Sequence, residues 1–313
     1  MKKIYALGEA LIDFTAGQTE ADKNAFYKNA GGAPANVAAC VAKLGGKSCV
    51  ITKLGKDMFG EFLKLTLEKA GVNTDYVYFT GEANTALAFV SLGENGEREF
   101  TFYRSPSADM LLSDDDVKNI VFDKTDVLHF GSVDLIDAPV RGAHDALIKK
   151  ARDSGAVISF DPNLRYSLWK DKNILLQTVR EYIPLADIIK VSDDELRDIT
   201  GIADDKTAIK SLFKGEVKLV IVTKGARGAI AFTQKSDVFV PSVKVEKAVD
   251  TTGAGDSFIG AVLYQLVENG FNTTESELKK ILTYANKTAA FVVCGTGAIP
   301  SMPDRAQVFF EEL

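Results

Sequence analysis

The segment of this sequence best suited to chemistry is Asp-Thr-Thr-Gly-Ala-Gly-Asp-Ser at residues 250–257. Gly253 and Gly255 flank Ala254 and permit a tight turn in which successive backbone N–H groups point the same way. The apolar residues that follow predict a buried helix starting near Asp256, and the N-terminus of a helix attracts anions. A carboxylate beside such a pocket can accept the proton of a hydroxyl while the pocket receives a phosphoryl group. Asp256 is therefore a candidate general base, although a lone Asp in a first helical turn is more often only a cap.

This segment resembles the C-terminal signature of the ribokinase-like (PfkB-type) carbohydrate kinases. In that family the Asp is the catalytic base, and the preceding amides, here those of Gly253, Ala254 and Gly255, form the anion hole. Residues 31–38, Gly-Gly-Ala-Pro-Ala-Asn-Val-Ala, resemble the N-terminal signature of the same family. Other segments resemble its fructokinase branch, so that the similarity covers essentially the whole chain. The resemblance implies an ATP-dependent fructokinase that uses Mg²⁺ and forms fructose 6-phosphate.

Several alternatives stay open. A 2-keto-3-deoxygluconate kinase, a ribokinase or an aminoimidazole riboside kinase would share these signatures, and Arg104 with Arg165 could bind the carboxylate of a sugar acid. A nicotinamide-dependent oxidoreductase would need Gly-x-Gly-x-x-Gly after a strand, which the chain lacks. Gly-Lys-Ser at residues 46–48 imitates the end of a P-loop, but Val41 stands where the first glycine should be. A sugar-sensing protein without catalysis fits everything except Asp256.

The resemblance also assigns residues to the sugar. Asp13 lies beyond the apolar run at residues 4–7, and we expect it on a loop at the end of that strand. Phe89 and Phe102 sit in runs with period two, where aromatic residues either close over a ligand or pack in a core. The residues expected at the sugar are Asp13, Gly31, Gly32, Asn36, Phe89, Phe102, Arg104 and Arg165.

Nucleotide and metal residues follow from the same resemblance. Glu195 would hold Mg²⁺ through water, and Ser192 stands where the broad family has an Asn. Asp250 and Thr252 resemble the family's monovalent-cation site, in which backbone oxygens hold K⁺. The residues expected at ATP are Ser192, Thr223, Lys224, Gly225, Gly228, Gly253, Gly255 and Asn286.

Periodicity predicts the elements that position these residues. Apolar strands alternate with helical stretches from residue 126 onward, which indicates a doubly wound, mostly parallel α/β sheet. Residues 85–91 and 98–104 alternate with period two around Gly-Glu-Asn-Gly, so we expect a β-hairpin there. We expect one ribokinase-like domain over residues 1–313, with a small β-lid formed from about 13–32 and 76–105.

Composition limits the class of protein. A chain of 313 residues with 46% hydrophobic content can bury a large core, and its net charge of −6 without a basic stripe argues against nucleic-acid binding. Glu9 and Asp13 interrupt the apolar run that a signal peptide would need, so we expect a cytoplasmic protein with no membrane segment. Three widely spaced cysteines indicate neither a disulfide framework nor a zinc site. We expect a homodimer, because a lid would carry an exposed apolar face.

Overall fold

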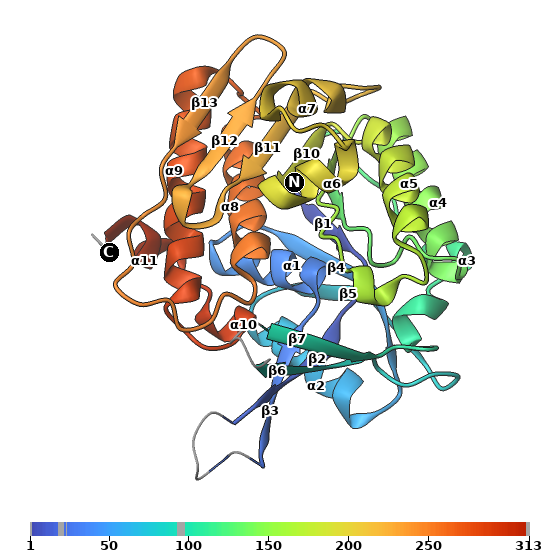
Figure 1. Ribbon diagram of the computed structural model, residues 1–313. Coiled ribbons are helices and arrows are strands. Elements are labelled where there is room, and N and C mark those ends of the chain that lie inside the picture. Colours follow the sequence, from blue (N-terminus) through green and yellow to red (C-terminus); the bar gives the residue numbers. More distant parts are fainter. Residues whose placement is uncertain (1, 18–21, 23, 93–97, 311–313) are drawn as a thin grey trace.

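The computed structural model describes residues 2–17, 22, 24–92 and 98–310, and its ribbon shows helices on both faces of one large twisted sheet (Figure 1). The nine strands of this sheet lie in the order β13-β12-β11-β10-β9-β8-β1-β4-β5. All neighbouring pairs from β11 to β5 are parallel, and only β12 and β13 add antiparallel strands at one edge. The doubly wound, mostly parallel sheet expected from the sequence is therefore confirmed. The strands are β1 (Ile4–Leu7), β4 (Ser48–Gly55), β5 (Asn73–Thr80), β8 (Val127–Phe130), β9 (Val157–Phe160), β10 (Ile188–Ser192), β11 (Leu219–Thr223), β12 (Ala229–Phe232) and β13 (Asp237–Val240).

Helices cover the two faces of this sheet with separate hydrophobic cores. One core packs around α8, α9 and α1, and the other packs around α4 and α5. Strands β1 and β8 are buried at all four positions because both of their faces are covered, which explains their continuous apolar runs. The helices are α1 (Ala33–Lys43), α2 (Met58–Lys69), α3 (Asp114–Val117), α4 (Pro139–Ser154), α5 (Lys172–Tyr182), α6 (Asp193–Thr200), α7 (Asp205–Leu212), α8 (Ala254–Glu268), α9 (Glu275–Val293), α10 (Ala298–Ser301) and α11 (Arg305–Phe310).

A second, small sheet lies beside the large one and contains four strands in the order β3-β2-β6-β7. Its strands are β2 (Leu11–Ala16), β3 (Phe26–Gly31), β6 (Leu87–Leu92) and β7 (Arg98–Tyr103). The expected hairpin is present as the antiparallel pair β6–β7, and its turn at 93–97 lies outside the described residues.

The boundaries of the small sheet differ from the expectation at one end. Residues 76–80, which we assigned to the lid, belong to β5 and pair in parallel with β4 at the edge of the large sheet. β5 is an edge strand that is exposed or only partly buried at every position except Thr80, and a sequence pattern alone cannot tell an edge strand of one sheet from a strand of another.

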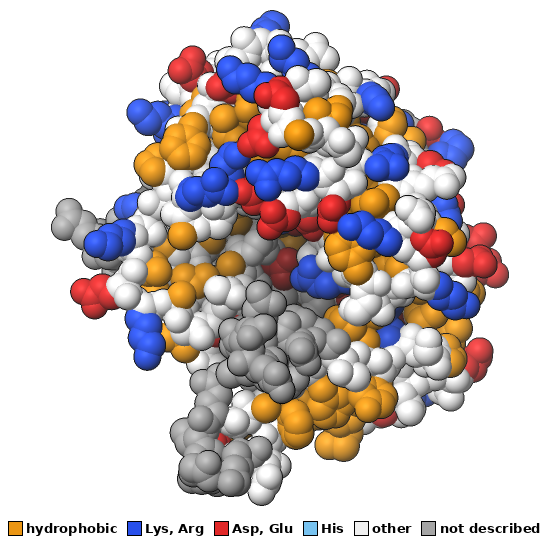
Figure 2. All heavy atoms as spheres, viewed as in Figure 1, with side chains coloured by type: hydrophobic (Ala, Val, Ile, Leu, Met, Phe, Trp, Pro, Cys, Tyr) orange, Lys and Arg blue, Asp and Glu red, His pale blue; other side chains and the backbone are white. Residues whose placement is uncertain are grey.

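The face of the molecule seen in Figure 2 shows no large area of charge of a single sign. Lys and Arg side chains are interspersed with Asp and Glu over the face seen in Figure 2. Among the described residues, no helix is both long enough and apolar enough to span a bilayer.

Candidate active site

The site is organised by a sharp bend that leads into α8. Gly253 adopts a left-handed conformation, with φ of 78°, and a Cβ placed on it would lie 2.5 Å from the Cβ of Ala298. Only glycine satisfies both conditions, because L residues resist positive φ and the space is already filled. The helix then begins at Ala254, so that Gly255 and Asp256 lie in its first turn.

The amides of this turn form only part of the expected anion hole. The N–H of Ala254 donates to the carbonyl oxygen of Thr251 at 3.3 Å, which occupies one predicted donor. Within the part of the chain that the structure describes, the N–H groups of Gly253, Gly255 and Asp256 make no hydrogen bond. Those of Gly255 and Asp256 lie in the first turn of a helix of 15 residues, where unsatisfied donors can bind an anion.

The carboxylate of Asp256 is held by α1. Its Oδ2 accepts a hydrogen bond of 2.8 Å from Nδ2 of Asn36, while Oδ1 of Asn36 is buried without a partner. Burial raises the pKa of Asp256, and the Asn36 hydrogen bond and the charges of Arg165 and Lys190 oppose that rise. A carboxylate with these opposing influences can be ionised and still accept a proton, as a general base requires.

Asp256 lies at the meeting point of two cavities. The first has a volume of about 480 Å³ and lies between the small sheet, the large sheet and the start of α8. It is lined by polar groups suited to hydroxyls, including Asp13, Asn36, Asn163, Arg165, Lys190 and Asp256.

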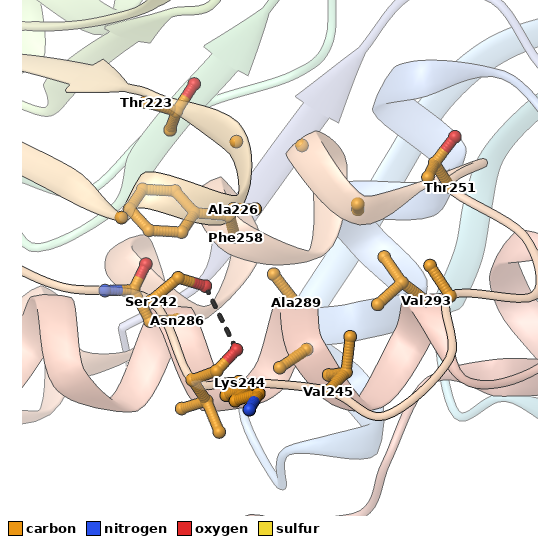
Figure 3. A pocket seen from close by; sticks show the side chains of 17 residues that line it. Thr223, Ala226, Ser242, Lys244, Val245, Thr251, Phe258, Asn286, Ala289 and Val293 are labelled. Carbon is orange, nitrogen blue, oxygen red and sulfur yellow. Dashed lines mark hydrogen bonds between the residues drawn. The ribbon is translucent and has the colours of Figure 1, made fainter.

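The second cavity, of about 490 Å³, lies between the β11–β12 turn, the loop after β13, and helices α8 and α9. Its walls are largely apolar, with Phe258, Ala289 and Val293 among them, which suits a flat aromatic base. Figure 3 shows Ser242 and Asn286 at one end and Thr251 and Val293 at the other. Thr251 and Gly255 line both cavities, so the bend before α8 is the point at which they meet.

Five of the eight residues expected at the sugar line the first cavity: Asp13, Gly32, Asn36, Phe102 and Arg165. Asp13 lies in strand β2 of the small sheet, not on the loop that we expected. The chain turns at Gly8 and pairs again at once, so the segment after the first strand is itself a strand. Gly31 does not line the cavity, but a Cβ there would collide with the carboxylate of Asp13, so its role is to leave room for that side chain.

Phe89 and Phe102 lie on opposite faces of the small sheet. In the β6–β7 register Phe102 pairs with Ala88, one residue before Phe89, and neighbouring positions of a strand face opposite sides. Phe102 lines the cavity, whereas the ring of Phe89 stacks on Phe14 with centroids 5.0 Å apart. The expectation that Phe89 contacts the sugar is therefore wrong.

Arg104 belongs to a buried ion-pair cluster and does not itself line the first cavity. Its Nε donates to Oδ2 of Asp109 at 2.7 Å, another of its nitrogens donates to Asp134, and Nη1 donates to the carbonyl oxygen of Val133 at 3.3 Å. Its side chain is only 3% exposed. Contrary to the expectation, Arg104 is therefore not at the first cavity, because Asp109, five residues away, and Asp134, 30 residues away, bind its guanidinium.

Most residues expected at the nucleotide fall in the second cavity: Thr223, Gly225, Gly228, Gly255 and Asn286. Asn286 donates to the carbonyl oxygens of Val240 and Pro241, which fixes the loop after β13. Gly253 lines the first cavity instead. Ser192 and Lys224 line neither cavity, since Ser192 caps α6 and Lys224 forms an ion pair of 2.9 Å with Asp205.

The residues expected at metals are engaged with the backbone. The two oxygens of Glu195 accept from the N–H groups of Leu164 and Ser192, at 2.7 and 2.8 Å. Asp250 accepts from the N–H groups of Thr252 and Gly297, which joins its own loop to the loop before α10. The described residues contain no group of three or more His, Cys, Asp or Glu side chains that could hold a metal ion. Glu195 retains free lone pairs, so a water-mediated contact to a cation bound by phosphates fits its position.

Three charged or amide side chains that line the first cavity were not predicted from the sequence: Glu9, Asn163 and Lys190. Lys190 could have been recognised from the sequence, because a lysine interrupts the apolar strand Ile-Ile-Lys-Val-Ser. A buried charge needs a partner, so such a lysine indicates a polar site. Asn163 follows β9 within the Asp-Pro-Asn segment and has a positive φ of 47°. For Glu9, only its position after the first strand could have indicated a place in the cavity.

Comparison with known proteins agrees with this geometry. The model of the pfkB family carbohydrate kinases matches residues 1–305. A curated relative, probable fructokinase-5 of Arabidopsis thaliana, is 46% identical over 308 residues, which cover 97% of this chain and 95% of the relative.

Solved structures of sugar kinases superpose over nearly the whole chain. Fructokinase with bound ATP from Xylella fastidiosa has a TM-score of 0.89 at 34% identity and covers 98% of this chain and 97% of its own. A fructokinase double mutant from Vibrio cholerae, bound to fructose, ADP and a potassium ion, has a TM-score of 0.88 at 33% identity, with coverage of 99% and 97%. Aminoimidazole riboside kinase from Salmonella enterica has a TM-score of 0.88 at 30% identity, with coverage of 98% and 99%.

Proposed function

The chain belongs to the pfkB family of carbohydrate kinases, and from this premise we propose that it is an ATP-dependent fructokinase that forms fructose 6-phosphate. The observation that carries the proposal is Asp256, which lies where a polar cavity for an acceptor meets an apolar cavity for a nucleotide base. Phosphoryl transfer needs this arrangement, because attacking hydroxyl, base and phosphoryl group must meet at one point.

We assign a role to each group in this proposal. Fructose occupies the first cavity, where Asp13 and the free Oδ1 of Asn36 accept hydrogen bonds from its hydroxyls. ATP occupies the second cavity with its γ-phosphoryl group directed at the bend before α8. Asp256 takes the proton as the sugar hydroxyl attacks phosphorus, and the amides of Gly255 and Asp256 stabilise the charge that develops. The bond from phosphorus to the β–γ bridging oxygen breaks, and ADP leaves.

The cations belong to the nucleotide side of the site. Mg²⁺, when bound with ATP, neutralises phosphate charge, and Glu195 is the residue placed to hold it through water. Asp250 joins the loops at Thr252 and Gly297, and backbone oxygens of these loops would bind a monovalent cation such as K⁺. The Vibrio cholerae fructokinase was solved with a potassium ion, which supports this assignment.

One observation favours a second acceptor. A further cavity of about 860 Å³ adjoins the first and shares Phe102 and Leu168 with it, so that an acceptor larger than a hexose could extend into it. Trp169 lines this cavity, and its indole N–H is buried without a partner among the described residues. An aminoimidazole riboside is such a larger acceptor, because it carries an imidazole ring in addition to the sugar.

The test is a panel of acceptors with Mg-ATP and mass detection of the product. The panel contains fructose, ribose, 2-keto-3-deoxygluconate, aminoimidazole riboside and glucose at equal concentration. We expect the highest kcat/KM with fructose. A higher kcat/KM for the riboside would replace fructose as the acceptor, and the absence of any phosphorylated product would overturn the kinase assignment.

We also propose that two copies associate through the outer face of the small sheet, the face that carries Phe89. Phe26 and Tyr103 are 51% and 63% exposed there and pack edge-on against Phe89. Exposed aromatic residues in one cluster are typical of an interface. Analytical ultracentrifugation should show a dimer that Phe26→Asp dissociates, and a wild-type monomer at high concentration would refute the proposal.

A further inference from the structure

Glu9 follows strand β1 and lies buried in the wall of the first cavity. It is only 4% exposed, and it lines the cavity together with Leu11 and Asp13, the alternate residues that follow it. Its Oε1 accepts a hydrogen bond of 3.0 Å from the N–H of Ala33, at the start of α1. Its other carboxyl oxygen makes no hydrogen bond to another residue that the structure describes, so it is available to a ligand in the cavity.

Three buried carboxyl groups share one cation in this part of the molecule. Arg104 donates to Asp109 and to Asp134, whereas no ion pair joins it to Glu9 within the described residues. Burial lowers the pKa of the nearby His144 to about 4, so this ring adds no positive charge. Three ionised carboxylates against one guanidinium would leave negative charge uncompensated in the interior. The group of acids therefore retains a proton, because a buried charge without a partner is costly.

The contacts place this proton on Glu9. Burial raises the pKa of Glu9, and the charge of Asp134 raises it further, while Arg104 and the amide of Ala33 oppose the rise. Burial also raises the pKa of Asp134, but Arg104 donates to that carboxylate directly and stabilises its ionised form. The other charged side chains that line the first cavity are Asp13, Arg165, Lys190 and Asp256. Glu9 thus differs from the two acids bound to Arg104 in having no cation as a hydrogen-bonding partner.

We propose that Glu9 is a specificity-determining residue that acts as a neutral carboxylic acid and donates its O–H to an oxygen atom of the sugar. The inference rests on the proposed kinase function and adds a sugar contact to it. A carboxylic acid that its surroundings keep neutral is an effective hydrogen-bond donor in an enzyme site. In the proposed complex Asp13 accepts hydrogen bonds from sugar hydroxyls and Glu9 donates one, so that the two acids together fix the orientation of the sugar.

The test is the pH dependence of KM for the acceptor. In the wild type, KM should rise about 3- to 10-fold as the pH is raised through the pKa of Glu9, because ionisation removes one hydrogen bond to the sugar. Glu9→Gln keeps an N–H donor of the same shape and cannot ionise, so its KM should stay low and should not rise with pH. Glu9→Met has no donor, and its KM should be raised at every pH. The Kd for ATP, measured by calorimetry, should stay within threefold of wild type in both variants.

A variant of the neighbouring acid tests the same proton from a distance. Asp134→Asn keeps the shape of the side chain and removes the charge that raises the pKa of Glu9. The rise in KM should therefore begin at lower pH than in the wild type. Glu61→Gln is the matched control, because Glu61 is an exposed acid on α2 that does not line the first cavity. Its KM should follow the wild-type profile.

Three results would overturn the proposal. They are a wild-type KM that does not change with pH, a Glu9→Gln variant whose KM is raised or still rises with pH, and a profile that Asp134→Asn leaves in place. If Glu9→Met fails to fold, the profiles of Glu9→Gln and Asp134→Asn decide the question without it. The assay uses whichever acceptor the wild type phosphorylates best, so failure of fructose as the acceptor and failure of this inference are separate outcomes.

Discussion

The molecule contains two buried clusters of charge with different uses. The first, which we call the transfer cluster, consists of Asn36, Asp161, Lys190 and Asp256. The second, the hinge cluster, consists of Glu9, Arg104, Asp109 and Asp134 and lies where the small sheet joins the large one. Each joins segments remote in sequence, and each contains one buried cation among carboxylates.

The two clusters differ in how many of the hydrogen-bonding groups of their polar side chains have partners. In the hinge cluster the guanidinium of Arg104 is bound on several sides by Asp109, Asp134 and a backbone carbonyl. In the transfer cluster the ammonium of Lys190 and the amide of Asn36 retain unused capacity beside a cavity. The guanidinium of the hinge cluster is therefore used to hold two sheets together, although Oδ2 of Asp134 is buried without a partner. The ammonium of the transfer cluster has unused donors beside a cavity, and such a cation can bind and stabilise a reacting group.

The largest expected effect is on kcat and comes from the general base of the transfer cluster, Asp256. Asp256→Asn keeps the shape and removes the proton acceptor, so kcat should fall about 10²- to 10⁴-fold. ATP affinity and Tm should change little, because the second cavity does not depend on this carboxylate. Steady-state kinetics and calorimetry check both parts, and a kcat near that of wild type would remove Asp256 from the mechanism.

The next effect should appear in stability. Arg104→Met leaves Asp109 and Asp134 buried without their cation, which costs about 3–5 kcal/mol of the free energy of unfolding. Urea denaturation measures this loss. Arg197→Met, at an exposed ion pair with Asp194, should change stability by less than about 0.5 kcal/mol. If Arg104→Met instead raised KM for fructose and left stability unchanged, Arg104 would be the sugar ligand that its sequence motif suggested.

A smaller effect concerns pH. Asn36 stabilises the ionised form of Asp256, so Asn36→Leu should raise the pKa of that carboxyl. A general base must be deprotonated, and the acidic limb of the kcat profile should therefore move to higher pH. The profile is measured at saturating fructose to separate it from sugar binding. An acidic limb at the wild-type position would show that Asn36 does not control the base.

The smallest effect tests the hinge cluster. Burial, and then the charge of Asp134, raise the pKa of Glu9 above its ordinary value, so the folded state binds a proton that the unfolded state releases. Stability is therefore lost as the pH rises from the unfolded pKa of about 4.5 through the folded pKa. Glu9→Gln removes this loss and should raise the stability by about 1–3 kcal/mol at pH 8, with little change at pH 5. Thermal unfolding at both values checks it, and equal shifts would contradict the explanation.

Sequence reasoning found the transfer cluster better than the hinge cluster. Asp256 and Asn36 lie in segments whose glycines and helix starts can be recognised locally, and the structure brings them within a hydrogen bond of each other. Asp134, which binds Arg104, lies 30 residues away in the sequence. No local sequence pattern shows that an arginine within a motif will form an ion pair with so remote a carboxylate.

The other site residues that were not predicted correctly also depend on contacts between segments remote in sequence. Period two shows that Phe89 and Phe102 belong to strands, but only the β6–β7 register decides which ring faces the cavity. The lysine of β10 could be recognised as unusual, yet its place beside Gly255 depends on the packing of α8 against the sheet.

The role of Asp256 in sugar phosphorylation is tested most directly by ³¹P NMR of wild type and Asp256→Asn, each incubated with Mg-ATP and fructose. We predict that the wild type forms ADP and a fructose monophosphate in equal amounts, and that the variant binds ATP normally but forms neither at a comparable rate. A sugar phosphate made equally fast by the variant, or inorganic phosphate in place of a sugar phosphate in the wild type, would contradict it.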